Sequence, residues 1–157
     1  SEIWGVFRVA RRARPVQSRL KRLDNGRVKF EGGHNGYHRL PGKVTHNRTI
    51  DYDRKHGWWI EDNLLGEGRH KVENFIHLAP DLKIGSVSHG SLIVLENSSG
   101  KRIAQIGLPD NLETDLMSGK YFPEFGICEP NQVIRLFGEV ELPFVSGYRI
   151  RGIGAVE

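Results

Sequence analysis

The sequence predicts an all-β protein, an antiparallel β-sandwich of a supersandwich-like type with little or no helix. Three observations lead to this prediction. Short apolar stretches alternate with polar residues along the 157-residue chain, which is the period of a strand with one buried face. Turn-forming groups of glycine, asparagine and serine separate these stretches. Helical periodicity is rare, so roughly eight to eleven strands in one domain over residues 1–157 are expected.

The first predicted element is a hairpin over residues 16–31. Its centre is Asn25-Gly26, a pair that favours a two-residue hairpin turn, and alternating apolar residues flank it. Further strands are predicted at residues 43–52, 57–63, 69–79, 91–96, 101–107, 132–142 and 147–151. Residues 110–118 are the best helical candidate, because Asp110 is a suitable N-cap.

Composition limits the functional classes. Hydrophobic residues make up 38% of the chain, which is enough for a real core at this length. No run of 18 apolar residues is present, so no membrane partner is expected. The single cysteine, Cys128, excludes an internal disulfide framework and a cysteine-rich zinc site.

Basic residues are concentrated in the N-terminal part of the chain. Residues 1–31 hold nine Arg and Lys against three Asp and Glu, a net charge of +6, whereas the whole chain carries +4. Arginine matches the geometry of carboxylate, sulfate and phosphate groups, so an acidic polysaccharide or a nucleic acid would suit this segment. A nucleic acid is the weaker reading, because no aromatic sheet motif or recognition helix is present. The alternative is an ordinary solvated strand face.

Two further segments gather chemistry-bearing side chains. The segment 33–40 brings His34, Tyr37 and His38 between glycines, which suits either acid–base chemistry or a turn rich in hydrogen bonds. Metal binding is disfavoured there, because no carboxylate or cysteine stands beside the two histidines. On the following strand, alternation places His46 and Arg48 on one face, which could meet a carboxylate or simply face water.

The adjacent residues Trp58 and Trp59 should point to opposite faces of their strand. One of them must therefore lie outside the core of a simple sandwich. An exposed tryptophan on a sheet can stack on a sugar ring or pack against another domain.

Several of these segments, in this order, resemble the C-terminal β-sandwich region of the heparinase II/III-like polysaccharide lyases. The resemblance covers about residues 3–155. The matching pieces are residues 4–9 with Arg12-Ala13, His34 to Leu40, Val44 to Arg48, Trp59 to Asp62, Leu65 to His70, Tyr121 to Gly126, and Leu142 to Phe144.

The resemblance implies a parent protein with an upstream α-helical toroid and a β-sandwich. Such lyases cleave uronate-containing polysaccharides by β-elimination. The family's catalytic residues lie in the toroid and in a His-x-His-Ala-Asp segment at the start of the sandwich, which can hold a structural zinc. This chain has no such segment, so no catalytic residue and no cofactor are assigned to it, and a zinc is expected only in the parent.

The leading hypothesis is therefore the distal part of this sandwich, inactive alone, in a lyase that is periplasmic or secreted rather than cytoplasmic. The start at Ser1, without an initiator methionine, fits a fragment. The polymer could be heparan-type, alginate or a bacterial exopolysaccharide. Candidate substrate-binding residues are Arg12, His34, Tyr37, His38, His46, Arg48 and Trp58. The alternative is a non-catalytic carbohydrate-binding or structural packing module.

Overall fold

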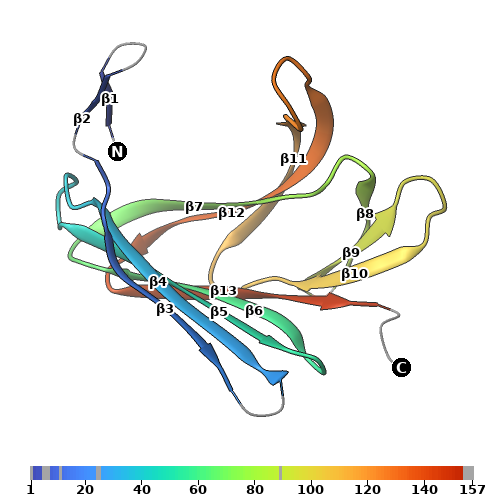
Figure 1. Ribbon diagram of the computed structural model, residues 1–157, viewed down its shortest axis with the longest axis horizontal. Coiled ribbons are helices and arrows are strands. Elements are labelled where there is room, and N and C mark those ends of the chain that lie inside the picture. Colours follow the sequence, from blue (N-terminus) through green and yellow to red (C-terminus); the bar gives the residue numbers. More distant parts are fainter. Residues whose placement is uncertain (1, 5–7, 11, 24–25, 89, 154–157) are drawn as a thin grey trace. The chain divides into compact units, whose positions relative to one another are not determined.

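The computed structural model describes residues 2–4, 8–10, 12–23, 26–88 and 90–153. Within these residues the chain forms thirteen β-strands and no α-helix (Figure 1), which confirms the all-β prediction. The strands are β1 (Glu2–Trp4), β2 (Arg8–Ala10), β3 (Pro15–Arg22), β4 (Val28–Tyr37), β5 (Val44–Asp53), β6 (Gly57–Leu65), β7 (Arg69–His77), β8 (Leu82–Ser88), β9 (Ser91–Glu96), β10 (Arg102–Gly107), β11 (Glu113–Tyr121), β12 (Glu129–Glu141) and β13 (Phe144–Gly152).

Contacts divide the chain into two compact units. The first unit comprises residues 1–70 and 139–147, and the second comprises residues 71–138 and 148–157. Because β7, β12 and β13 each run from one set of residues into the other, both units use parts of these three strands.

The first unit is built on the antiparallel run β3-β4-β5-β6, whose strands lie side by side in Figure 1. The hairpin predicted over residues 16–31 is confirmed as β3 and β4, with Arg22 opposite Val28. Gly26 has a φ of 78°, the left-handed conformation that a tight hairpin turn requires. Its partner in the predicted turn, Asn25, lies outside the described residues, as do Gly5 to Phe7 of the first family-like segment.

The register of these strands separates two faces. One face carries apolar residues at its centre, where Phe30, Ile50 and Ile60 stand opposite one another on β4, β5 and β6. The other face carries Lys29, Glu31 and neighbouring polar residues. Burial does not alternate with this chemistry, because nearly every residue of β4 and β5 is half-buried.

The two adjacent tryptophans point to opposite faces, as predicted. Trp58 is 46% exposed, whereas Trp59 is half-buried. A Cβ atom on Gly147 of β13 would lie 2.5 Å from the Trp59 ring, so the indole lies directly against the glycine backbone. Glycine at this position therefore allows Trp59 to be covered, while Trp58 remains open to water.

The second unit holds the most deeply buried side chains of the described residues. Leu92 of β9, Ile106 of β10, and Ile134 and Leu136 of β12 are each at most 2% exposed. Burial of each such side chain contributes about 1.5–3 kcal/mol. In the sequence these residues alternate with more exposed neighbours on β9 and β10, which is why those strands were predictable.

The predicted helix at residues 110–118 is wrong. Most of this segment belongs to β11, which pairs with β12 over nine residues from Glu113–Phe137 to Tyr121–Glu129. The long β12 offers a complete hydrogen-bond ladder, and this non-local pairing outweighs the local signal of a capping aspartate. A Cβ on Gly119 would lie 2.4 Å from the Val133 side chain, so this glycine serves cross-strand packing.

β8 was missed in the sequence, and the total of thirteen strands among the described residues exceeds the predicted number. No element was assigned to this segment from the sequence, which contains glycine and serine there. The structure uses Gly85 for close contact with Leu95 of β9, where a Cβ would lie 2.3 Å from the leucine side chain. The pairing shifts between Ile84 and Ser86, so the strand contains an irregularity that obscures its alternation.

No helix among the described residues is long and apolar enough to cross a membrane.

We expect Ile134→Ala to lower the free energy of unfolding by about 2–5 kcal/mol, because it leaves a cavity where a fully buried side chain stood. The matched control is Ile127→Ala, which removes the same atoms from a side chain that is 42% exposed. The control should change stability by about 0.5 kcal/mol or less. Urea denaturation measures both values. Equal losses in the two variants would contradict the assignment of this core.

Candidate functional site

Four side chains on one face of β4, β5 and β6 form a connected cluster. The strand register places His34 opposite His46 and Arg48 opposite Asp62. His34 Nε2 lies 3.2 Å from His46 Nδ1, and His46 Nε2 lies 2.6 Å from Asp62 Oδ1. Arg48 donates to both oxygens of Asp62, each at 2.7 Å. We call these four residues the Asp62 cluster.

The hydrogen bonds fix where the protons of the cluster lie when both rings are neutral. Gly36 N–H donates to His34 Nδ1 at 3.1 Å, so this nitrogen carries no proton. The proton of His34 is therefore on Nε2, and it is donated to His46 Nδ1. His46 in turn carries its proton on Nε2 and donates it to Asp62. All four ring nitrogens thus have partners within the protein.

The electrostatics of the cluster follow from this geometry. Burial alone would raise the pKa of Asp62, but hydrogen bonds from His46 and Arg48 outweigh it and lower the pKa to about 2. The pKa of His34 is lowered because burial disfavours its charged form and because His46 repels a second positive charge. The cluster therefore holds a carboxylate and favours a neutral His34.

The chain leaving β4 places three further side chains beside the cluster. The Tyr37 ring lies 5.2 Å from the His34 ring and 6.5 Å from the His46 ring, between ring centroids. Arg39 donates to the Gly36 carbonyl at 2.5 Å, and its guanidinium lies 6.0 Å from the Tyr37 ring. His38 Nε2 lies 2.7 Å from Thr45 Oγ1. Tyr37 and His38 are both exposed. Tyr37 borders the cluster, whereas Thr45, the partner of His38, alternates to the face opposite His46.

Arg12 belongs to the same neighbourhood through the backbone. Arg14 N–H donates to Asn35 Oδ1 at 2.9 Å, and Asn35 N–H donates to the Arg14 carbonyl at 3.1 Å. These bonds hold residues 12–14 beside the turn that contains Tyr37. Arg12 itself is exposed, two residues from this anchor. The described contacts therefore join four of the sequence-predicted residues, His34, Tyr37, His46 and Arg48, while Arg12 and His38 lie nearby along the chain.

Trp58 is the exception. It stands opposite Tyr52 on β5, whereas the nearest member of the Asp62 cluster on that strand is Arg48. Four residues separate Tyr52 from Arg48, and a strand rises about 3.3 Å per residue, so the two places are about 13 Å apart. The Ile60 side chain lies between them and is only 8% exposed. Trp58 therefore belongs to a different part of the sheet.

The sequence reading missed Asp62 as a member of the site, although it lies in a family-like segment. A signal was available. The turn between β5 and β6 is short, and Asp53 pairs with Gly57. In an antiparallel hairpin this register fixes every other pair, so Arg48 must stand opposite Asp62. An acidic residue opposite an arginine on a half-buried strand pair predicts an ion pair.

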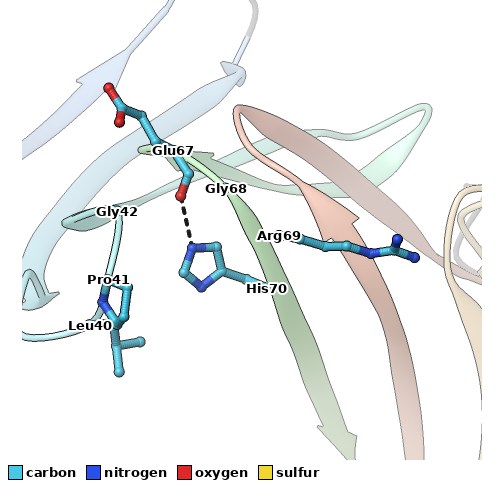
Figure 2. A pocket seen from close by; sticks show the side chains of 7 residues that line it. All are labelled: Leu40, Pro41, Gly42, Glu67, Gly68, Arg69 and His70. Carbon is cyan, nitrogen blue, oxygen red and sulfur yellow. Dashed lines mark hydrogen bonds between the residues drawn. The ribbon is translucent and has the colours of Figure 1, made fainter.

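A separate shallow pocket of about 480 Å³ lies in the first unit, between the turn after β4 and the turn after β6. Figure 2 shows the seven residues that line it, which are Leu40, Pro41, Gly42, Glu67, Gly68, Arg69 and His70. His70 Nε2 lies 3.0 Å from the Glu67 carbonyl oxygen, while the Glu67 carboxylate and the Arg69 guanidinium both point away from His70. The pocket therefore offers an imidazole and an apolar wall without a charged group directed inward.

No group of three or more His, Cys, Asp or Glu side chains that could hold a metal ion is present in the described part of the chain. In the Asp62 cluster, the ring nitrogens of His34 and His46 have protein partners instead.

Comparison with known proteins defines the class. The family model of the heparinase II/III-like C-terminal region matches residues 1–149. The chain therefore belongs to the heparinase II/III-like family as a C-terminal region, which confirms the resemblance seen in the sequence. A search of curated proteins gives no match.

Solved structures share the fold. A mutant of the heparan sulfate lyase HepC from Pedobacter heparinus is similar with a TM-score of 0.68 and 12% identity, over 89% of this chain and 21% of that chain. The unmutated HepC gives a TM-score of 0.66, with 12% identity over 92% of this chain and 22% of that chain. A heparinase III is similar with a TM-score of 0.66 and 10% identity, over 88% of this chain and 21% of that chain. This chain thus spans about a fifth of the length of these relatives.

We expect Asp62→Asn to lower the free energy of unfolding by about 1–3 kcal/mol, because it leaves His46 and Arg48 with a neutral partner. The control is Asp51→Asn, whose carboxylate binds only the half-exposed Arg27 and should cost about 1 kcal/mol or less. The difference should shrink as the pH falls from 3.8 toward about 2, where wild-type Asp62 itself becomes protonated. Chemical denaturation at several pH values measures it, and equal costs for both variants would contradict the role of Asp62.

The lowered pKa of His34 predicts a second pH dependence. The unfolded chain takes up a proton near the ordinary pKa of 6.5, before the folded chain does. The His34 contribution to stability is therefore present above this pH and is lost as the pH falls below it. We expect His34→Gln to flatten the decline in unfolding free energy between about pH 7 and pH 5. His77→Gln, which alters an exposed histidine of β7, should leave the slope unchanged. Parallel curves for wild type and His34→Gln would refute this expectation.

Proposed function

We propose that this chain is the C-terminal β-sheet region of a lyase that cleaves uronate-containing acidic polysaccharides by β-elimination. The observation that carries this proposal is the family match over residues 1–149. The similar solved structures, described as heparan sulfate lyases, support a polysaccharide as the substrate class. Because the chain spans about a fifth of their length, we place the catalytic groups in a further part of the protein.

The chemistry of β-elimination supports this division. The reaction needs a base that removes the proton at C5 of the uronate, groups that neutralise its carboxylate, and an acid for the leaving oxygen. In the Asp62 cluster both histidines have partners at both ring nitrogens, and Arg48 binds Asp62. A general base needs a free nitrogen directed at substrate. The cluster is thus better suited to hold a surface in place than to transfer protons.

We therefore assign the predicted substrate-binding residues two roles. The exposed side chains of Arg12, Tyr37 and His38 contact the polymer directly. His34, His46 and Arg48 act as positioning residues, because their bonds to Asp62 and to Gly36 hold the turn that presents Tyr37 and His38. The exposed cations Arg19 and Lys21 of β3 supply positive charge that attracts an acidic chain.

The remaining parts of the proposal concern the longer protein. We propose that an upstream α-helical toroid in the same chain and the His-rich start of the sandwich carry catalysis, and that this His-rich segment holds a structural zinc. The 157 residues by themselves are expected to lack lyase activity.

The test compares this chain with the same chain extended upstream, on a panel of acidic polysaccharides that includes heparan sulfate and alginate. Ultraviolet absorbance of the unsaturated uronate product reports elimination. We expect product from the extended protein only. Activity of the short chain would overturn the placement of catalysis and direct attention to His34, Tyr37 and His38. No product from either protein, together with glycan binding, would support a carbohydrate-binding module, and no product and no binding would support a structural packing module.

The direct contacts have a separate test in the extended protein. Tyr37→Phe keeps the ring and removes the hydroxyl, whereas Tyr37→Ala removes both. We expect Tyr37→Ala to raise KM by about fivefold to tenfold with little change in kcat, because it removes binding rather than chemistry. Tyr121→Ala, at a comparably exposed tyrosine of β11, is the control. A fall in kcat at unchanged KM would instead assign Tyr37 to the chemical step.

A further inference from the structure

An exposed aromatic pair lies at the far end of the β3–β6 sheet, away from the Asp62 cluster. The ring centroids of Tyr52 and Trp58 are 4.5 Å apart, with planes inclined by 38°. Trp58 is 46% exposed, although its neighbour Trp59 is covered by the packing against Gly147. A half-exposed tryptophan in contact with a second ring gives a rigid apolar surface of the kind that accepts a flat ligand face.

Positive charge surrounds this pair. The register aligns Arg22, Val28, Tyr52 and Trp58 in one row across four strands, so the Arg22 side chain is on the same face as the two rings. The adjoining turn between β5 and β6 adds the exposed residues Arg54 and Lys55. We call Arg22, Tyr52, Arg54, Lys55 and Trp58 the hairpin-tip cluster.

The described acidic residues near this cluster, Asp51 and Asp53, are already paired. Asp51 binds Arg27 through both oxygens. Asp53 accepts bonds from the backbone N–H groups of Lys55 and His56, and the His56 ring lies 3.0 Å from its second oxygen. In the part of the chain that the structure describes, no ion pair involves Arg22, Arg54 or Lys55. Their charges therefore remain available to an external anion.

We propose that the hairpin-tip cluster is a second contact site for the acidic polysaccharide, separate from the one at the Asp62 cluster. The Trp58 and Tyr52 rings stack against the C–H face of a sugar, and Arg22 pairs with its carboxylate or sulfate. The proposal rests on the proposed function for the identity of the polymer. Because about 13 Å of strand and the buried Ile60 separate the aromatic pair from the Asp62 cluster, one disaccharide does not contact both.

Because the two sites are separated, the effect of a substitution on binding should depend on the length of the saccharide. A long polymer contacts both sites at once, which raises its affinity above that of either site alone. A substitution that abolishes the contact at the hairpin-tip cluster therefore removes this increase in affinity. A disaccharide occupies one site only. The strength of the tip contact should also fall with added salt, because the arginine charge is exposed to solvent.

The experiment measures binding by isothermal titration calorimetry with the full-length protein, using heparan sulfate and alginate as polymers and as disaccharides. We expect Trp58→Ala to weaken polymer binding by about tenfold, which corresponds to about 1.4 kcal/mol. Arg22→Gln, at an exposed position of β3, should weaken it by about twofold to fivefold. The affinity of the disaccharide for the site at the Asp62 cluster and the kcat of the lyase should stay unchanged. Phe125→Ala, at an exposed aromatic residue of the second unit, is the control.

The outcomes separate this inference from the proposed function. If wild type cleaves the polymer and both tip variants bind it as wild type does, the second site is refuted while the lyase assignment stands. If wild type binds but cleaves nothing and the tip variants bind more weakly, the second site stands and the lyase assignment fails. Equal weakening for double-stranded DNA and for polysaccharide would reveal a general polyanion surface and overturn the sugar contact. Absence of binding to every polymer would overturn both.

Discussion

The carboxylate of Asp62 is the constraint on which the rest of the candidate site depends. From β6 it accepts hydrogen bonds from His46 and Arg48 on β5, and through His46 it fixes the proton position of His34 on β4. One side chain thus links three neighbouring strands. Its pKa, lowered to about 2, keeps it charged at ordinary pH, so its ion pair with Arg48 is present there.

This constraint also explains the division of roles on the sheet. Side chains that the sequence pattern presented as ligands for an external carboxylate already bind an internal one. Arg48 donates two hydrogen bonds to Asp62, and both ring nitrogens of His46 have hydrogen-bond partners. The groups left to meet a ligand stand at the rim, where Tyr37 and His38 are exposed, and at the hairpin tip, where Trp58 lies beside Tyr52.

The parts of the fold that could be predicted are those with local signals. The first hairpin followed from Asn25-Gly26 and the alternation around it, and the opposite directions of Trp58 and Trp59 followed from the geometry of a strand. The predicted helix at 110–118 failed because pairing with β12 is non-local and leaves little trace in β11, most of whose side chains are exposed. β8 was not predicted, because its Gly85 interrupts the apolar alternation and lies in close contact with Leu95.

The sequence by itself determined the all-β class, most strand positions, the basic N-terminal part and the membership of the heparinase II/III-like family, because periodicity, turn residues and ordered motifs are carried by the chain itself. Only the tertiary structure decided which candidates act together. It joined His34, His46 and Arg48 through Asp62, and it placed Trp58 elsewhere on the sheet. The physical reason is that strand register, set by hydrogen bonds between segments, decides which side chains meet.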